Sequence, residues 1–137
     1  MRVGLFALVA VGVPIPAQAQ EEAIDCNDPV TQFEMNECAY RDWQAADANL
    51  NEAYGFAIAH AQRIDTSAAM TGDTRDTGTE EMLRRAQRAW ITFRDAACSV
   101  ESDIALGGSM QPMLYSGCLT ALTRRRAEDL RYFGEFN

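Results

Sequence analysis

Four cysteines that follow an export-like segment constrain this chain more than any other feature. Residues 1–19 contain an early arginine, a short apolar run and an Ala-Gln-Ala triplet, which together are typical of a secretory signal peptide. We expect cleavage near Ala19 and a mature chain that is periplasmic or secreted. An even number of cysteines in such an oxidising space indicates disulfide bonds. The thiols that we expect to be consumed in this way are Cys26, Cys38, Cys98 and Cys118.

The predicted signal peptide, residues 1–19 (the leader), also indicates how the chain relates to the membrane. Its apolar run, from Val3 to Ile15, is shorter than the ~20 residues that a transmembrane helix needs. No cysteine follows the expected cleavage site directly, so we expect no lipid anchor. Residues 20–137 are therefore predicted to form one domain without a membrane anchor.

The charge of the chain favours one class of partner over others. Its net charge is −8, and it becomes −9 when Arg2, the only charged residue of the leader, is removed. A chain this acidic is repelled by nucleic acid and by anionic lipid and is attracted by basic proteins. We therefore expect no nucleic-acid partner.

Apolar residues recur at spacings of three and four in three segments, which is the pattern of amphipathic helices. The first segment, 31–63, opens with Thr31 and Glu34, the hydroxyl and carboxylate of a capping box. The second spans about 79–106 and the third about 110–133. Because no strand pattern competes, we expect an all-α fold, a small bundle of three helices braced by disulfides.

Four cysteines allow three disulfide connectivities, and the sequence alone does not choose among them. The Gly-Gly-Ser segment 107–109 is expected to turn the second helix back on the third. Cys98 lies ten residues before the middle of this segment, and Cys118 lies ten residues after it. Residues equidistant from a helical turn face each other, so we predict a Cys98–Cys118 bond. The remaining bond then joins Cys26 to Cys38.

Residues around these cysteines form a longer pattern. In the first half it reads Thr31-Gln32-x-x-Met35-Asn36-x-Cys38-Ala39 and Asp47-x-x-Leu50-Asn51-x-x-Tyr54. In the second half it reads Leu83-x-x-Ala86-Gln87-Arg88-Ala89-Trp90-Ile91-x-Phe93-Arg94-Asp95-x-x-Cys98, followed by Leu122-Thr123-x-x-Arg126. Over about residues 26–133 the chain resembles the lysozyme inhibitor LprI-like N-terminal domain family.

The resemblance implies a small, exported, helical and disulfide-bonded protein. The family takes its name from a lipoprotein reported to inhibit lysozyme, so a lysozyme or another basic wall-cleaving enzyme is the implied partner. The polar residues that the motif contains are Asn36, Asp47, Asn51, Gln87, Arg94 and Asp95.

The sequence contains few candidate catalytic residues. The thiols are expected to be oxidised and His60 is the only histidine, so a nucleophile beside a base is lacking. No CxxC or HxxxH spacing offers a metal site. We expect His60 to lie near the end of the first helix and to interact there with the helix dipole. The chain is therefore predicted not to be an enzyme and to need no cofactor or metal.

One face of the second predicted helix carries Gln87, Trp90 and Arg94 at spacings of three and four. Arg94 is expected to reach Asp47 or Asn51 on the first helix. Such a pair fixes the register between helices, often without a net gain in stability. A polar binding groove is the alternative interpretation of the same residues.

Residues 65–79 show no apolar period and are expected to form a long loop. The loop carries Asp65, Asp73 and Asp76 and is the surface that we favour for contact with a partner. A solvated connector is the alternative role for this segment.

These observations predict an exported protein-binding module, a lysozyme inhibitor that occludes the enzyme cleft without covalent chemistry. Lysozymes are strongly basic, and an acidic protein is steered toward them at low salt. The alternative is a structural or envelope-stress protein that contacts cell-wall polymer and has no lysozyme target.

Overall fold

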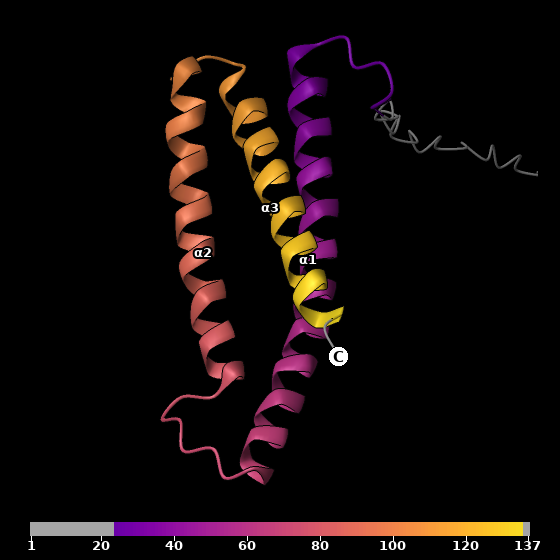
Figure 1. The fold of residues 1–137 in the computed structure, drawn as a ribbon. Coiled ribbons are helices and arrows are strands. Elements are labelled where there is room, and N and C mark those ends of the chain that lie inside the picture. Colours follow the sequence, from indigo (N-terminus) through magenta and orange to yellow (C-terminus); the bar gives the residue numbers. More distant parts are fainter. Residues whose placement is uncertain (1–23, 136–137) are drawn as a thin grey trace, which may run out of the picture.

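The computed structural model describes residues 24–135, and helices dominate it (Figure 1). Within these residues no strand occurs, so the predicted all-α bundle of three helices is confirmed. The predicted leader, residues 1–19, lies outside the described residues. The elements are α1 (Gln32–Met70), α2 (Thr79–Ser102), the short 3-10 helix η1 (Asp103–Ala105) and α3 (Gln111–Glu135).

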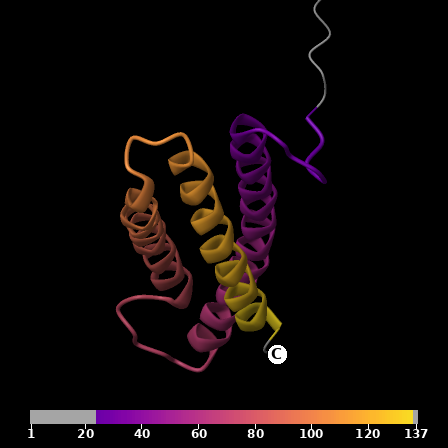
Figure 2. The ribbon, with the colours of Figure 1, turned by 90° about the horizontal axis from the view of Figure 1, so that it is seen from above.

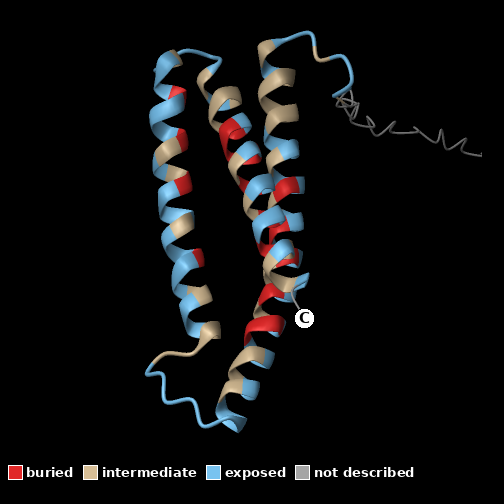
Figure 3. Cartoon of the chain, viewed as in Figure 1, coloured by how far each residue is buried: buried red, intermediate tan, exposed pale blue. Residues whose placement is uncertain are grey.

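The main core lies between α1 and α3, and α2 packs less closely beside them (Figures 1 and 2). Leu50, Ala53 and Ala57 recur on α1 at spacings of three and four, and Ala127 and Leu130 meet them from α3. Small alanines at a helix contact allow the two axes to approach closely. Burying each leucine stabilises the fold by about 1.5–3 kcal/mol. Figure 3 shows that the buried residues face the interior of the bundle.

A second apolar cluster surrounds the disulfide between α2 and α3. Cys98 and Cys118 are bonded with their Cα atoms 5.4 Å apart, and Leu119 is buried beside them. Trp43 of α1 packs against this cluster, so residues of all three helices meet around the disulfide. The predicted Cys98–Cys118 connectivity is confirmed.

The segment before α1 is held by the other disulfide and by a cap. Cys26 is bonded to Cys38 with a Cα separation of 5.5 Å, as predicted. The Thr31 hydroxyl accepts the backbone N–H of Glu34 at 3.2 Å, and the Glu34 carboxylate accepts that of Thr31 at 2.7 Å. The backbone N–H groups of Thr31 and Val30, which both donate to the Glu34 carboxylate, lower its pKa. The predicted capping box is therefore confirmed.

The first helix is longer than predicted, and the following loop is shorter. α1 continues to Met70 instead of ending near residue 63, and the connector is confined to residues 71–78. Gly72, at φ +76°, ends α1 in the left-handed conformation. The N–H of Gly72 bonds to the carbonyl of Ala69 and that of Asp73 bonds to Ala68, which is the Schellman pattern.

The other boundaries differ from the predicted ones by a few residues. α2 ends at Ser102, and the residues that were expected to complete it form η1. Gly107, at φ +74°, then reverses the chain toward α3. Among residues 24–135, no helix is long and apolar enough to cross a bilayer.

Candidate functional site

Arg94 is the centre of a polar network between the three helices. Only 7% of its surface is exposed, and its Nε donates to the Asp95 carboxylate at 2.8 Å. Its Nη1 donates to the Thr123 hydroxyl at 3.3 Å and lies 3.6 Å from Oδ1 of Asp47. The guanidinium lies 5.2 Å from the centre of the Trp90 ring. The expected contact between Arg94 and the first helix is thus present, and it runs to Asp47.

A second arginine completes the network from α3. Arg126 donates its Nε to the Oε1 atom of Gln87 at 3.0 Å, and its guanidinium lies 6.0 Å from the ring of Trp90. Trp90 therefore contacts two cations. Both contacts are favourable because the face of an aromatic ring carries partial negative charge. Partial burial lowers the pKa of the Arg126 guanidinium, which is desolvated between the helices.

Asn51 and Asn36 are two further polar residues of the family motif. Asn51 contacts this network, and Asn36 lies apart from it. Asn51 donates to the Asp47 carboxylate at 3.3 Å. Asn36 lies apart, and its side chain donates to the backbone carbonyl of Ser109 at 2.9 Å, which fastens the turn between α2 and α3 to α1. Arg94, Gln87 and Asn36 thus make contacts that link the helices, whereas Asn51 and Asp95 make contacts within their own helices.

Two members of the network had not been predicted as site residues. Thr123 and Arg126 belong to the quoted family pattern, and their spacing of three places them on one face of α3. That spacing, beside the matching face of α2, is the signal that could have identified them. The sequence does not show which partner each would take.

The three aspartates assigned to the predicted loop have different environments. Asp65 lies in α1, which corrects its assignment to the loop. Its carboxylate accepts the backbone N–H groups of Glu80 at 3.0 Å and of Thr79 at 2.7 Å, and these donors lower its pKa. Asp73 forms an ion pair with Arg75, and this partner lowers the pKa of Asp73.

Asp76 is the remaining acidic residue of the connector. It is exposed and makes no hydrogen bond or ion pair with any other residue of the described chain. Since Asp65 belongs to α1 and Asp73 is paired with Arg75, Asp76 is the one predicted loop aspartate that remains unpaired in the connector 71–78.

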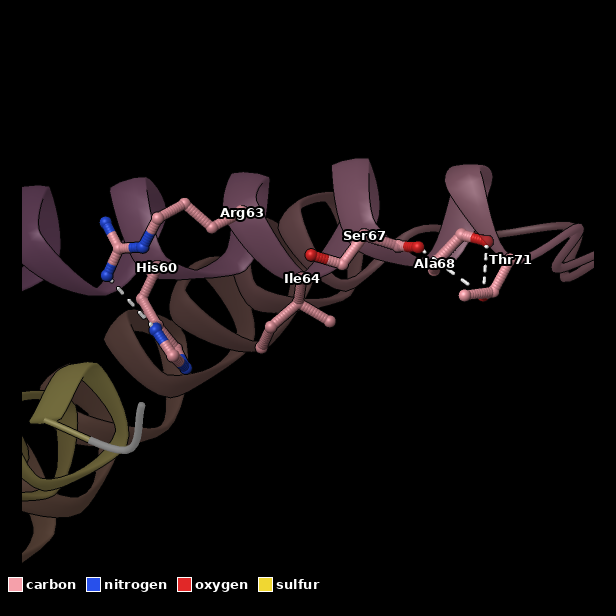
Figure 4. A pocket seen from close by; sticks show the side chains of 6 residues that line it. All are labelled: His60, Arg63, Ile64, Ser67, Ala68 and Thr71. Atoms are coloured by element: carbon pink, nitrogen blue, oxygen red, sulfur yellow. Dashed lines mark hydrogen bonds between the residues drawn. The ribbon is translucent and has the colours of Figure 1, made fainter.

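His60 lines an open groove near the C-terminal end of α1 (Figure 4). The prediction that it lies at the end of the helix is wrong, because α1 continues for ten residues to Met70. His60 is buried, its ring meets Phe133 edge-on at 5.0 Å, and its Nδ1 lies 3.2 Å from Nη2 of Arg63. The residues lining the groove are His60, Arg63, Ile64, Ser67, Ala68 and Thr71.

The groove offers little for catalysis. None of its lining residues is a carboxylate, whereas glycoside hydrolysis requires a pair of them across a cleft. Within residues 24–135, no group of three or more histidine, cysteine or acidic side chains is arranged to hold a metal. The groove therefore contains neither the acid pair of a glycosidase nor a metal centre.

Charge is distributed unevenly along the bundle. The bundle can be divided into two parts at the level where Arg94 contacts Asp47 and Thr123. The part on the side of both disulfides, residues 24–47 and 94–123, contains nine acidic residues and two arginines, a net charge of −7. The other described residues, 48–93 and 124–135, contain nine of each and have no net charge.

We call the first of these parts the disulfide end. It holds all the net charge of the described chain, whereas the connector 71–78 lies at the opposite end (Figure 1). It also exposes apolar side chains next to its acids, and Val30 and Phe33 are 76% and 70% exposed. This end of the bundle therefore combines negative charge with exposed apolar side chains.

Known proteins resemble this chain in sequence and in fold. An uncharacterised protein of Rhizobium meliloti is 45% identical over 116 residues, which cover 85% of this chain and 83% of that protein. The uncharacterised protein YecT of Escherichia coli is 25% identical over 103 residues, which cover 72% of this chain and 62% of YecT. A crystal structure of a DUF1311 family protein from Pseudomonas putida has a TM-score of 0.62 and 27% identity, and covers 78% of this chain and 97% of its own.

A family model described as lysozyme inhibitor LprI matches residues 26–130. The matched range contains both disulfides and every residue of the polar network around Arg94. The match covers most of the described residues, and the chain belongs to the lysozyme inhibitor LprI family.

Proposed function

We propose that this protein is an exported inhibitor that binds a lysozyme or a related basic wall-cleaving enzyme and blocks its cleft. The observation that carries the proposal is the family match over residues 26–130. The two disulfides support an oxidising location outside the cytoplasm. Binding and occlusion are the whole mechanism, and no bond in the enzyme or its substrate is made or broken by the inhibitor.

The chemistry of the side chains supports a binding role. All four cysteines are consumed in disulfides, so no thiolate is available as a nucleophile. His60, the single histidine, lies against Phe133 and Arg63, and among the described residues it makes no hydrogen bond to a hydroxyl or thiol. The polar network around Arg94 is occupied by contacts within the bundle.

The disulfide end is the surface that we assign to the enzyme. Its charge of −7 attracts a basic protein over about one Debye length, roughly 8–10 Å at moderate salt. The Cys26–Cys38 bond and the Thr31 cap hold the segment that presents Val30 and Phe33, so little ordering is needed on binding. Charge would then accelerate the encounter, and the apolar side chains would slow dissociation.

A lysis assay with matched variants tests this assignment. Mature protein is mixed with lysozymes of several classes, and the clearing of a bacterial suspension is followed at rising salt. We expect inhibition that weakens with salt. The double variant Asp28→Lys/Asp42→Lys at the disulfide end is expected to lose most of it. Glu52→Lys/Glu128→Lys, which changes the net charge equally at the neutral end, is the matched control and should inhibit like the parent.

A sedimentation assay with peptidoglycan sacculi separates this function from the envelope-protein alternative. If the protein co-sediments with sacculi and inhibits no lysozyme at micromolar concentration, the inhibitor proposal is wrong. If both charge variants lost inhibition equally, the protein would still be an inhibitor, but the disulfide end would not be its binding surface.

A further inference from the structure

α2 carries an apolar stripe on the side that faces away from the rest of the bundle. Its members alternate in spacing between four and three residues, and every one of them is exposed. Met82, Phe93 and Val100 have exposed fractions of 45%, 60% and 74%. Ile104 in η1 extends the row and is 86% exposed. Within α2 the stripe consists of Met82, Ala86, Ala89, Phe93, Ala96 and Val100.

The stripe is separate from the face of α2 that holds the bundle together. That inner face presents Leu83, Gln87, Trp90, Arg94 and Cys98 to α1 and α3. α2 stands to one side of the α1–α3 pair, and its outer face is not covered by the described chain (Figures 1 and 2). The inner face alone is sufficient to attach α2 to the bundle, so the outer stripe is not explained by the fold of one molecule.

The spacing of the stripe matches helix-on-helix packing. Apolar residues that alternate four and three apart repeat every seven residues, which is the repeat of a helix that packs along another helix. The row covers almost the full length of α2, from its first turn to its end. An exposed apolar strip of this kind marks an interaction surface.

The charges beside the stripe indicate the occupant. Arg85 makes no hydrogen bond or ion pair within the described chain. The carboxylate of Asp103, eighteen residues later, accepts only a long hydrogen bond of 3.4 Å, from the side chain of Gln111. Eighteen residues are five helical turns of 3.6 residues, so on a continuous helix the two charges lie on the same flank of the stripe.

In an antiparallel pair of identical helices related by a two-fold axis, the flank of one helix that carries Arg85 and Asp103 lies beside the same flank of the other helix. Arg85 of one copy then faces Asp103 of the other, and the start of the stripe at Met82 lies close to its end near Ile104 of the other copy. A parallel pair would instead place the two Arg85 residues at the same level on opposite flanks, so that neither faces Asp103. It would also bring the two acidic disulfide ends together, whereas the antiparallel pair keeps them apart.

We propose that the outer stripe of α2 binds the same stripe of a second copy of this chain, antiparallel, in a two-fold symmetric dimer. The interface is isologous and closed, so it stops at two copies. This inference does not depend on the proposed function, and a dimer carries one disulfide end at each extremity.

Sedimentation equilibrium of the mature protein over a wide concentration range tests the dimer. We expect the mass to double as concentration rises. Phe93→Glu should remain monomeric throughout, with an unchanged helical circular-dichroism spectrum. The matched control is Phe56→Glu on α1, because Phe56 is exposed to 62% and lies outside the stripe. A parent protein that stays monomeric, or a Phe93→Glu variant that still dimerises, would overturn the proposal.

Charge reversal tests the antiparallel register. Arg85→Glu and Asp103→Arg are each expected to weaken dimerisation about two- to thirtyfold, because a two-fold dimer contains the exposed ion pair twice and each variant loses both copies. The double variant Arg85→Glu/Asp103→Arg should restore the parent affinity, because the pair is re-formed with opposite signs. Failure of the double variant to recover would reject this register. If Phe93→Glu abolished binding to lysozyme and the parent were monomeric, the stripe would belong to the enzyme.

Discussion

The carboxylate of Asp65 in α1 accepts the backbone N–H of Thr79, the first residue of α2, at 2.7 Å. The N-terminal N–H groups of a helix have no partner within the helix, and a side chain of the preceding residue normally satisfies one of them. Here that residue is Gly78, which has no side chain. α1 therefore supplies the missing cap from the other side of the connector.

Replacing Asp65 should loosen the start of α2 and destabilise the protein. We expect Asp65→Ala to lower the free energy of unfolding in urea at neutral pH. The folded-state pKa of Asp65 lies below its unfolded value, so this stabilisation is present above about pH 4 and is lost as the pH falls through the folded pKa. The difference between variant and parent should therefore shrink in acid.

The control for this prediction is Asp76→Ala. Asp76 is exposed and has no partner among the described residues, so its loss should leave stability nearly unchanged. Equal stability of Asp65→Ala and the parent at neutral pH would contradict the cap.

Gly78 is predicted to be required for the same cap. A Cβ atom at this position would lie 2.7 Å from Oδ2 of Asp65, although the backbone φ of −72° suits any residue. We expect Gly78→Ala to destabilise by displacing the carboxylate, and to have little further effect in an Asp65→Ala background. A double-mutant cycle in urea measures this coupling. Additive effects would mean that the two residues act independently.

Gly55 is the matched control for Gly78→Ala. It lies inside α1, and a Cβ there would meet no atom within 4 Å. Gly55→Ala should raise stability by about 1 kcal/mol, because alanine is favoured over glycine in a helix interior. The two substitutions thus have opposite predicted signs.

Arg94 should contribute strongly to stability, whereas its carboxylate partners should not. Arg94→Ala removes a buried side chain and two charge-assisted or hydroxyl hydrogen bonds, and we expect a loss of about 2–4 kcal/mol. Asp47→Ala should cost less than about 1 kcal/mol, because the side chain of Asp47 is 40% exposed and water replaces the contact. Chemical denaturation measures the free energy of unfolding of both variants. Comparable losses would contradict the prediction that Arg94 contributes more to stability than Asp47.

The two disulfides should have separable effects. Replacing Cys98 and Cys118 by serine is expected to cost about 2–4 kcal/mol, since that bond joins helices across the core. Replacing Cys26 and Cys38 should leave the melting of the bundle less affected, because that bond holds only the segment before α1. The same change should weaken inhibition of lysozyme by releasing Val30 at the disulfide end. A stable Cys98→Ser/Cys118→Ser variant would show that the helices do not need the bond.

The helices and the disulfide pairing could be predicted because both depend on local spacing. The capping box at Thr31 follows from residues three apart, and the Cys98–Cys118 bond follows from equal distances to one turn. The last turns of α1 were missed, because the polar run around Thr66 and Ser67 hides an apolar row that continues through Ile64 to Ala68.

Contacts between distant residues could not be predicted in the same way. The sequence predicts that Asp65 lies in the loop, yet its role as a cap depends on where Thr79 lies in space. The pairing of Arg126 with Gln87 depends on the register of α3 against α2, which the sequence of neither helix contains. The uneven charge of the bundle also appears only once the three helices are placed beside one another.

The central claim is that this chain binds a basic wall-cleaving enzyme through electrostatic attraction, and calorimetric titration measures that binding directly. Mature protein is titrated into lysozymes of several classes at low and at physiological salt. The account predicts a complex with one enzyme per chain for at least one class, with an affinity that falls as salt rises. No complex with any class at micromolar concentration, or an affinity that salt does not change, would contradict it.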